Sequence, residues 1–525
     1  MKKNPNFLWG GALILGWLFD FLFWKQSPGL NFAIYSVFCV AIGFVVLLTN
    51  QQHPSKGALW LLPLILFFAS TAVLRAEPLT LFLGTLFTLF LMSVLAITFL
   101  GGRWFWYSLA DYVSGFLKLA GSMLVQPLSF RSELKREQVE SGKPAHKLNP
   151  WPVIRGIVIA LPILAIFASL LASADVVFKD QLDILIKFAS IENLPQYIFR
   201  LTYILIGTYL LAGVFLHAAY QSKDERLFGE DKPLMEPILG FTESTIVLGS
   251  VAVLFAAFVI VQFRYFFGGQ ANINIEGFTY SEYARRGFGE LLIVAFFSLL
   301  MILGLSAITH RENEARRRLF SGLSVAVVAL VTIILVSAFQ RLALYEAAYG
   351  FSRLRTYTHV SLIWIGLLLI AVVILEIIRR ERAFAFAALI ASMGFAASLN
   401  ILNVDGFIVR QNAYRATQGQ GLDVPYLASL STDSIPVLVD TFRSPAYPGL
   451  TRDAIGAVLF CRLQSKTDRS SPDWRSFSLS RWKADTDLDS VRNSLAQYKV
   501  IDSGWPLRIL TPGNVSYSCY GDGSD

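Results

Sequence analysis

Residues 79–100 read LTLFLGTLFTLFLMSVLAITFL and carry no charged side chain. A helix needs roughly 20 apolar residues to cross the hydrocarbon core of a bilayer, so this stretch is long enough to span a membrane. The whole chain has the same character, because 54% of its 525 residues are hydrophobic and only 16% are charged. A soluble protein carries about 25% charged residues. The sequence therefore predicts an α-helical integral membrane protein.

Similar apolar runs recur up to residue 402 and predict about eleven transmembrane helices. After residue 402 no run is long and apolar enough to cross a bilayer. We therefore predict a transmembrane domain over 1–402 and a small α/β or mostly α domain over 403–525. The predicted spans are 7–24, 30–49, 58–75, 79–100, 151–173, 196–219, 238–265, 287–309, 319–340, 360–378 and 383–402.

The stretch 104–125 is apolar overall but contains Asp111 and Lys118. Both share one helical face with Ser108 and Ser122, because these positions recur at steps of three and four. An aromatic start and a single polar face favour a helix that lies in the membrane interface. The alternative is an ordinary span in which Asp111 and Lys118 pair inside the bundle.

Lysine and arginine gather in alternate inter-helix loops, including the long segment 101–150. Cytoplasmic loops of membrane proteins carry such an excess. We therefore predict a cytoplasmic amino terminus and, with eleven spans, an extracytoplasmic carboxy-terminal domain. Basic residues that are spread over short loops form no single binding face, which argues against nucleic acid as a partner.

The three cysteines and five histidines show no metal-ligand spacing. We therefore predict no metal site and no cofactor. Cys461 and Cys519 fall in the predicted extracytoplasmic domain, where disulfides can form. Two alternatives stay open for them, a disulfide or two buried thiols.

Three segments resemble a known family: 280–288 (YSEYARRGF), 341–358 (RLALYEAAYGFSRLRTYT) and 402–412 (LNVDGFIVRQN). With them, the sequence from about Trp151 to the end resembles the bacterial multi-pass membrane proteins called domain of unknown function 4173, or their sibling family 4153. Many relatives have Asn-Pro-Asp after the last span, whereas this chain has valine at position 404. The resemblance implies a bacterial cytoplasmic membrane protein and assigns no activity.

All three segments lie on the outer face in this topology, where arginines run against the positive-inside trend. Arginine with tyrosine at a membrane surface suits an anionic lipid headgroup, since the guanidinium offers a two-pronged donor. The alternative is that the tyrosines anchor the chain at the interface and the arginines pair with nearby acids or with lipid phosphate in general. The predicted ligand-binding residues are Arg286, Arg341, Arg353, Arg355, Tyr345 and Tyr349, with supporting acids Glu282, Glu290, Glu346 and Asp405.

Charges inside spans are rare, and Asp20 and Glu243 are two of them. We expect each to make a structural hydrogen bond. No catalytic residue is predicted, because no catalytic motif stands out. The sequence favours a non-enzymatic envelope sensor, regulator or scaffold that contacts the lipid bilayer. The alternative is a transferase or transporter that acts on a lipid-linked or anionic substrate.

Overall fold

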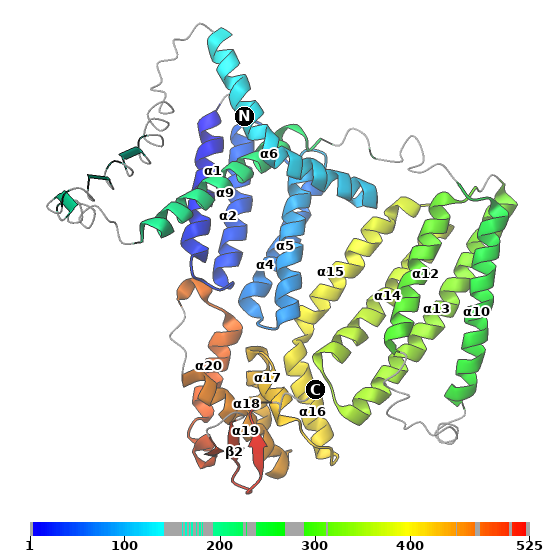
Figure 1. Ribbon diagram of the computed structural model, residues 1–525. Helices are drawn as coiled ribbons and strands as arrows, with labels where there is room; N and C mark the ends of the chain where they lie inside the picture. Colours follow the sequence, from blue (N-terminus) through cyan, green and yellow to red (C-terminus); the bar gives the residue numbers. More distant parts are fainter. Residues whose placement is uncertain are drawn as a thin grey trace. The chain divides into compact units, whose positions relative to one another are not determined.

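The computed structural model describes residues 4–140, 193–223, 227, 238–267, 288–310, 313–447, 449–467, 473–502 and 507–520, with scattered positions between 160 and 181. Within these ranges the chain is mostly helical, and its three short strands lie near the carboxy terminus (Figure 1). The helices group into two compact units. The first unit comprises residues 1–24, 41–52 and 118–221, and the second comprises residues 25–40, 53–117 and 222–525.

Ten helices among the described residues are long and apolar enough to cross a membrane. They match ten of the eleven predicted spans, which confirms the predicted helical membrane class. The eleventh, 151–173, lies outside the described residues apart from scattered positions. The ten spans are α1 (Pro5–Phe23), α2 (Leu30–Thr49), α3 with α4 (Lys56–Leu59 and Leu61–Leu74), α5 (Pro78–Thr98), α9 (Leu194–Tyr220), α10 (Phe241–Phe267), α12 (Phe288–Ile308), α13 (Glu314–Tyr349), α14 (Arg353–Ile377) and α15 (Phe384–Leu402).

Helix α6 (Leu109–Glu140) is not among these ten. It follows a short 3-10 turn at Trp104–Trp106. At its start, buried Asp111 accepts hydrogen bonds from Ser108, and Arg382 lies 3.3 Å from the same carboxylate. The polar face at this end therefore points into the protein, whereas Leu109 and its apolar neighbours are exposed. The interfacial position of this helix stays a prediction.

In the first unit, α1 packs against α9. Small residues allow the close approach, since a Cβ atom at Gly16 would lie 2.8 Å from the carbonyl oxygen of Ile204. Asp20 accepts two hydrogen bonds from the Arg200 guanidinium, at 2.8 and 2.5 Å, and one from the Tyr203 hydroxyl. The charge of Asp20 inside a span is thus compensated locally, as the structural interpretation requires.

The second unit has two hydrophobic cores. One lies among the spans α10, α12, α13 and α14, where Leu248, Ala295, Val331 and Leu369 are fully buried. At the start of α10, Glu243 accepts a hydrogen bond of 2.8 Å from the backbone of Gly240, the kind of structural contact expected for it. The other core belongs mainly to the residues that follow α15.

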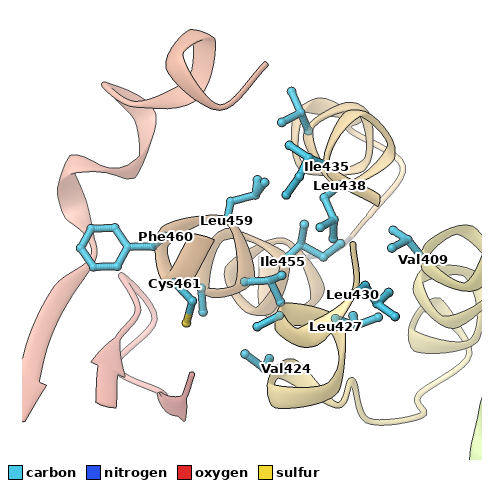
Figure 2. Packing of buried hydrophobic residues seen from close by; sticks show 14 of the residues in the cluster. Val409, Val424, Leu427, Leu430, Ile435, Leu438, Ile455, Leu459, Phe460 and Cys461 are labelled. Carbon is cyan, nitrogen blue, oxygen red and sulfur yellow. The ribbon is translucent and has the colours of Figure 1, made fainter. Parts of the chain in front are cut away.

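We call residues 404–520 the C-terminal segment. Its core surrounds α19, with Ile455 and Leu459 facing Leu427, Ile435 and neighbouring side chains (Figure 2). This core also includes Leu399 in α15. The predicted domain boundary at residue 403 stays a prediction. The segment contains α16 (Val404–Thr417), α17 (Val424–Ser429), α18 (Ile435–Arg443), α19 (Gly449–Thr467) and α20 (Leu479–Val491), followed by an antiparallel sheet of β1 (Lys499–Asp502), β2 (Arg508–Leu510) and β3 (Ser516–Ser518).

Cys461 on α19 and Cys519 after β3 form a disulfide, with 5.6 Å between their Cα atoms. Of the two alternatives that the sequence left open, the structure therefore contains the bonded one. The bridge closes a sequence separation of 58 residues and ties the sheet to α19. Cys39 is a buried free thiol.

Candidate functional site

Three short connections of the second unit bring buried acids together: the α4–α5 turn, the α15–α16 junction and a 3-10 turn at Thr432–Ser434. Each connection contributes one carboxylate, from Glu77, Asp405 and Asp433 respectively, and all three are almost completely buried. The first two turns of α14 supply a cationic and a phenolic partner. We call this group the polar clamp; it consists of Glu77, Arg353, Tyr357, Asp405, Tyr426, Ser431 and Asp433.

The strongest contact of the polar clamp joins Arg353 to Asp405. The guanidinium donates from Nε to Oδ1 at 2.8 Å and from Nη2 to Oδ2 at 2.6 Å. The backbone N–H of Ser431 donates to the same carboxylate at 2.6 Å. Such a two-pronged pair is among the strongest and most directional hydrogen-bonded contacts in proteins. It links the start of α14 to the start of α16, and Ser431 adds the turn before α18.

Glu77 forms the second contact, between α5 and α14. Its Oε1 accepts from the Tyr357 hydroxyl and from the backbone N–H of Leu79, and its Oε2 accepts from both the N–H and the hydroxyl of Thr80. Glu77 is therefore the N-cap of α5, and Pro78 follows in the first helical position, where its missing N–H is harmless. A residue that begins a membrane span thus also binds the neighbouring α14.

Asp433 forms the third contact and brings the C-terminal segment onto the α4–α5 turn. Its Oδ2 accepts from the backbone N–H groups of Ala76 and Glu77, at 2.7 and 2.9 Å. Its backbone carbonyl accepts from the Asn403 side chain at 3.2 Å. The two bonds to Ala76 and Glu77 join residues more than 350 positions apart in sequence.

Asn403 makes the sharp turn between α15 and α16 without a proline. Its φ of 52° is left-handed, a conformation that asparagine adopts more readily than most residues. Its side chain then caps α16 by accepting from the backbone of Gly406 at 3.1 Å. The turn places Asp405 two residues later, where the carboxylate meets Arg353.

Tyr426 completes the polar clamp from α17. Its hydroxyl accepts a hydrogen bond of 2.8 Å from the backbone N–H of Arg353. Burial raises the pKa of Tyr426, so the phenol is neutral at ordinary pH. All three carboxylates of the clamp thus accept hydrogen bonds from within the protein. A hydrogen-bonded arrangement of this kind fixes the geometry of its members.

The predicted ligand-binding arginines separate in the structure. Arg286, with the predicted acid Glu282, lies outside the described residues. Arg341 donates from Nη2 to the side-chain oxygen of Gln262 at 2.7 Å, and Arg353 belongs to the polar clamp. Of the predicted acids, Glu290 is exposed on α12. The predicted set is therefore spread over several environments.

Arg355 does meet the predicted tyrosines. Its guanidinium donates to the backbone carbonyl of Gly350 and lies 4.2 Å from the ring centre of Tyr345. Tyr349 packs on Tyr345, with 4.9 Å between ring centroids. Arg415, which sequence reasoning missed, donates to the carbonyls of Ala347 and Ala348 at the same helix end, at 2.9 and 3.0 Å. We call Arg355 and Arg415 the arginine pair.

The arginine pair concentrates positive charge at the end of α13. Burial first, and the charge of Arg355 second, lower the pKa of Arg415. The helix can end here because Gly350 has a φ of +84°, and a Cβ at that position would lie 2.6 Å from Arg415. Carbonyl oxygens at a helix end attract cations but neutralise them only in part.

Glu346, another predicted acid, is paired with a histidine of α14. Its buried Oε2 is 3.1 Å from the Nδ1 atom of His359 on α14. The ring of His359 also packs on Phe339, with centroids 4.4 Å apart. Glu346 therefore serves the packing of α13 on α14 rather than the compensation of Arg355.

Two acids of the polar clamp, Glu77 and Asp433, were not predicted as site residues. Glu77 before Pro78 reads as an ordinary helix cap, and Asp433 two residues after Ser431 reads as an ordinary turn. Arg415 likewise reads as a basic residue in the last turn of a helix. Within the described ranges, no group of three His, Cys, Asp or Glu residues could hold a metal ion.

Ten apolar helices among the described residues, with a C-terminal segment hydrogen-bonded to the α4–α5 turn and to the start of α14, define a multi-pass helical membrane protein. The chain belongs to the family described as "Domain of unknown function (DUF4153)", which matches residues 61–441. This confirms the sibling family 4153, and the matched range contains every residue of the polar clamp. Neither the curated proteins nor the solved structures include a match.

Proposed function

We propose that this chain is a non-enzymatic scaffold of the bacterial cytoplasmic membrane, with its amino terminus inside and its C-terminal segment outside. The polar clamp holds that segment on the outer ends of the membrane helices, and the arginine pair binds an anionic lipid headgroup beside it. Among a sensor, a regulator and a scaffold, the scaffold is the role that a fully hydrogen-bonded clamp favours.

One observation carries the proposal: the fully buried carboxylate of Asp405 is bonded to Arg353 and Ser431. A buried ion pair costs several kcal/mol to desolvate for each ion, so it adds little to stability beyond a hydrophobic contact. Its benefit is geometric, because only one relative position of α14, α16 and the Ser431 turn satisfies all of the bonds. A rigid attachment is what a scaffold needs.

The lipid site rests on the arginine pair. Both guanidinium groups contact only partial negative charges in the bonds described above, and one of them lies over an aromatic ring. Tyr349, whose backbone carbonyl accepts from Arg355, and Tyr414, the residue before Arg415, are both exposed. Planar guanidinium donors match phosphate oxygens, and tyrosine favours the level of the headgroups. The same chemistry would suit a lipid-linked phosphate.

The variant Glu77→Gln tests whether the protein is a scaffold or a transferase or transporter. The substituted amide loses the negative charge. Its one oxygen can still accept from Tyr357 and Leu79, while its NH2 group takes the place of the oxygen that accepts from Thr80 and can donate to the Thr80 hydroxyl. We expect membranes that carry this variant to keep the C-terminal segment resistant to protease, and we expect the variant to complement a deletion strain. Arg353→Ala should lose both properties together. If Glu77→Gln keeps its protease resistance but fails to complement, an active role of this acid replaces the scaffold.

Native mass spectrometry tests the lipid site. The double variant Arg355→Lys/Arg415→Lys keeps both charges but loses the planar forks. We expect it to retain fewer anionic lipids and an unchanged amount of zwitterionic lipid. The matched control is Arg443→Lys, because Arg443 contacts only the backbone and hydroxyl of Ser490 in the bonds described for it. Equal anionic-lipid retention in both variants would remove the site from the proposal.

A further inference from the structure

The first turn of α20 lies at the level where two membrane spans end. The backbone N–H of Leu30, the first residue of α2, donates to the carbonyl of Phe477 at 2.9 Å. The hydroxyl of Ser478 donates to the carbonyl of Val73, near the end of α4, at 3.3 Å. Helix α20 also packs beside α4 (Figure 1). Residues 477 and 478 are therefore fixed at the ends of two spans.

Side-chain bonds hold the same stretch against the turn before α2. Ser476 donates to the side-chain oxygen of Gln26 at 2.7 Å, and Arg481 approaches the hydroxyl of Ser27 at 3.3 Å. A Cβ atom at Gly29 would lie 2.6 Å from the carbonyl oxygen of Phe477, so the two backbones touch. The position of α20 relative to the start of α2 is thus set by contacts on both sides of Phe477.

Three large apolar side chains are exposed at this level. Trp474 is 55% exposed, Leu479 is 40% exposed and Trp482 is 56% exposed. Leu479 and Trp482 are three positions apart and share one face of α20. The opposite face of the helix, with Ala484 and Leu488, is buried in the core of the C-terminal segment.

The exposed apolar residues of α20 are confined to its first turn. One turn further along, the exposed positions are Thr486, Asp489 and Ser490. Exposed Lys483 stands beside Trp482, at the boundary between the two stretches. This order, from apolar near the span ends to polar further away, follows the polarity of a bilayer surface. If this surface bound a protein partner, nothing would require the change from apolar to polar residues to occur at the level of the span ends.

The geometry agrees with the thickness of the headgroup region. The polar layer adds about 5–8 Å on each side of the hydrocarbon core. Trp482 is four positions after Ser478, and a helix rises about 6 Å over four residue steps. Trp482 therefore stays within the layer even if α20 pointed straight away from the membrane. Tryptophan is the side chain most typical of this layer, because its ring is apolar and its N–H is polar.

We propose that Trp474, Leu479 and Trp482 insert into the headgroup layer of the leaflet on the side of the C-terminal segment. Lys483 and Arg481 are placed to meet lipid phosphate. The surface shares no residue with the polar clamp or the arginine pair, so the inference does not depend on the proposed function. Lipid is the occupant, and the segment has a contact with the membrane that is independent of its covalent link through α15.

The test uses the full-length protein in nanodiscs whose lipids are brominated near the headgroup end of the acyl chains. The fluorescence of Trp482 is obtained as the difference between the unmodified protein and Trp482→Phe. We expect bromolipid to quench this component and aqueous iodide to quench it little. Melting of the Phe variant should be unchanged, since the side chain is exposed.

The matched control is a tryptophan introduced by Ile501→Trp, into the background Trp482→Phe. Ile501 on β1 has the same exposed fraction as Trp482, 56%, and β1 pairs with β2 on the side of the segment away from α4 and α5 (Figure 1). We expect iodide to quench the residue-501 fluorescence and bromolipid to leave it unchanged. If Trp482 behaves like that control, or is quenched by neither agent because a protein covers it, the inference is overturned.

Discussion

Arg353 and Arg355 are two positions apart at the start of α14, yet their surroundings differ in almost every respect. Arg353 binds the buried carboxylate of Asp405 through two parallel hydrogen bonds. Arg355 contacts the carbonyl of Gly350 and the face of the Tyr345 ring. Arg353 is thus paired with a full negative charge of the C-terminal segment. The charge of Arg355 is compensated, in the contacts described, by a carbonyl dipole and an aromatic ring. Both residues are arginines in the first turn of the same helix. Their roles therefore differ because their tertiary contacts differ.

Removal of Arg353 should produce the largest effect. Arg353→Ala leaves Asp405 fully buried without its cation, and stranded buried charges of this kind cost about 3–5 kcal/mol of unfolding free energy. Arg355→Ala removes a partly exposed charge and should cost less than about 1 kcal/mol. Unfolding of both variants in lipid nanodiscs checks the difference. Similar losses for the two variants would mean that the two arginines do not have separate roles.

Opening the disulfide changes the unfolding free energy of the C-terminal segment without touching the polar clamp. Cys461→Ser/Cys519→Ser opens a bridge with a sequence separation of 58. The chain-entropy account credits such a bridge with about 4 kcal/mol. We expect the loss to appear in the unfolding of the segment, while α4 and α5 stay protected from hydrogen exchange. Because the bridge lies outside the polar clamp, its loss should add to that of Arg353→Ala; strong coupling between the two would contradict this separation.

Tyr357→Phe tests the second contact of the polar clamp. The variant removes the hydroxyl that donates to Glu77 and keeps the ring. A hydrogen bond to a charged group contributes about 1.5–3 kcal/mol. The control Tyr349→Phe should change the unfolding free energy very little, because Tyr349 is 52% exposed. Thermal unfolding of the two variants under the same lipid conditions compares them, and an unchanged Tyr357→Phe would remove Glu77 from the clamp.

The smallest effect is expected for Arg415→Gln. The variant loses an interaction of a cation with the end of α13, which is worth about 0.3–1 kcal/mol. It also removes the repulsion from Arg355, which offsets part of that loss. Unfolding should therefore change little while anionic-lipid retention falls. A large loss of stability would place Arg415 with the structural residues and set it apart from Arg355.

The sequence predicted the spans well because each apolar run carries its own signal. Ten of them match described helices, and neighbouring residues alone were enough to find them. The acids of the polar clamp carry no such signal. Glu77 and Asp433 are 356 positions apart, and each has an ordinary local role as a cap or a turn residue. Their meeting depends on tertiary structure, which local sequence signals do not reveal.

Pairing of the predicted outer-face arginines with acids was among the alternatives that the sequence left open, and Asp405 was one of the named acids. The sequence analysis therefore included the acid that pairs with Arg353 among its possible partners. What could not be predicted was that Arg355 would take no part in that pairing. A left-handed Asn403 begins α16 two residues before Asp405, and the Asp405 carboxylate meets Arg353 across the structure.

The most direct test of the polar clamp is a double-mutant cycle between Arg353 and Asp405, read by hydrogen exchange over residues 404–443 in lipid nanodiscs. We predict that Arg353→Ala and Asp405→Ala each accelerate exchange strongly. The double variant should accelerate it less than the sum of the two, because neither charge is then left alone. If the two effects simply add, or if exchange in this range stays at the level of the unmodified protein, Arg353 and Asp405 do not hold the C-terminal segment on the membrane helices.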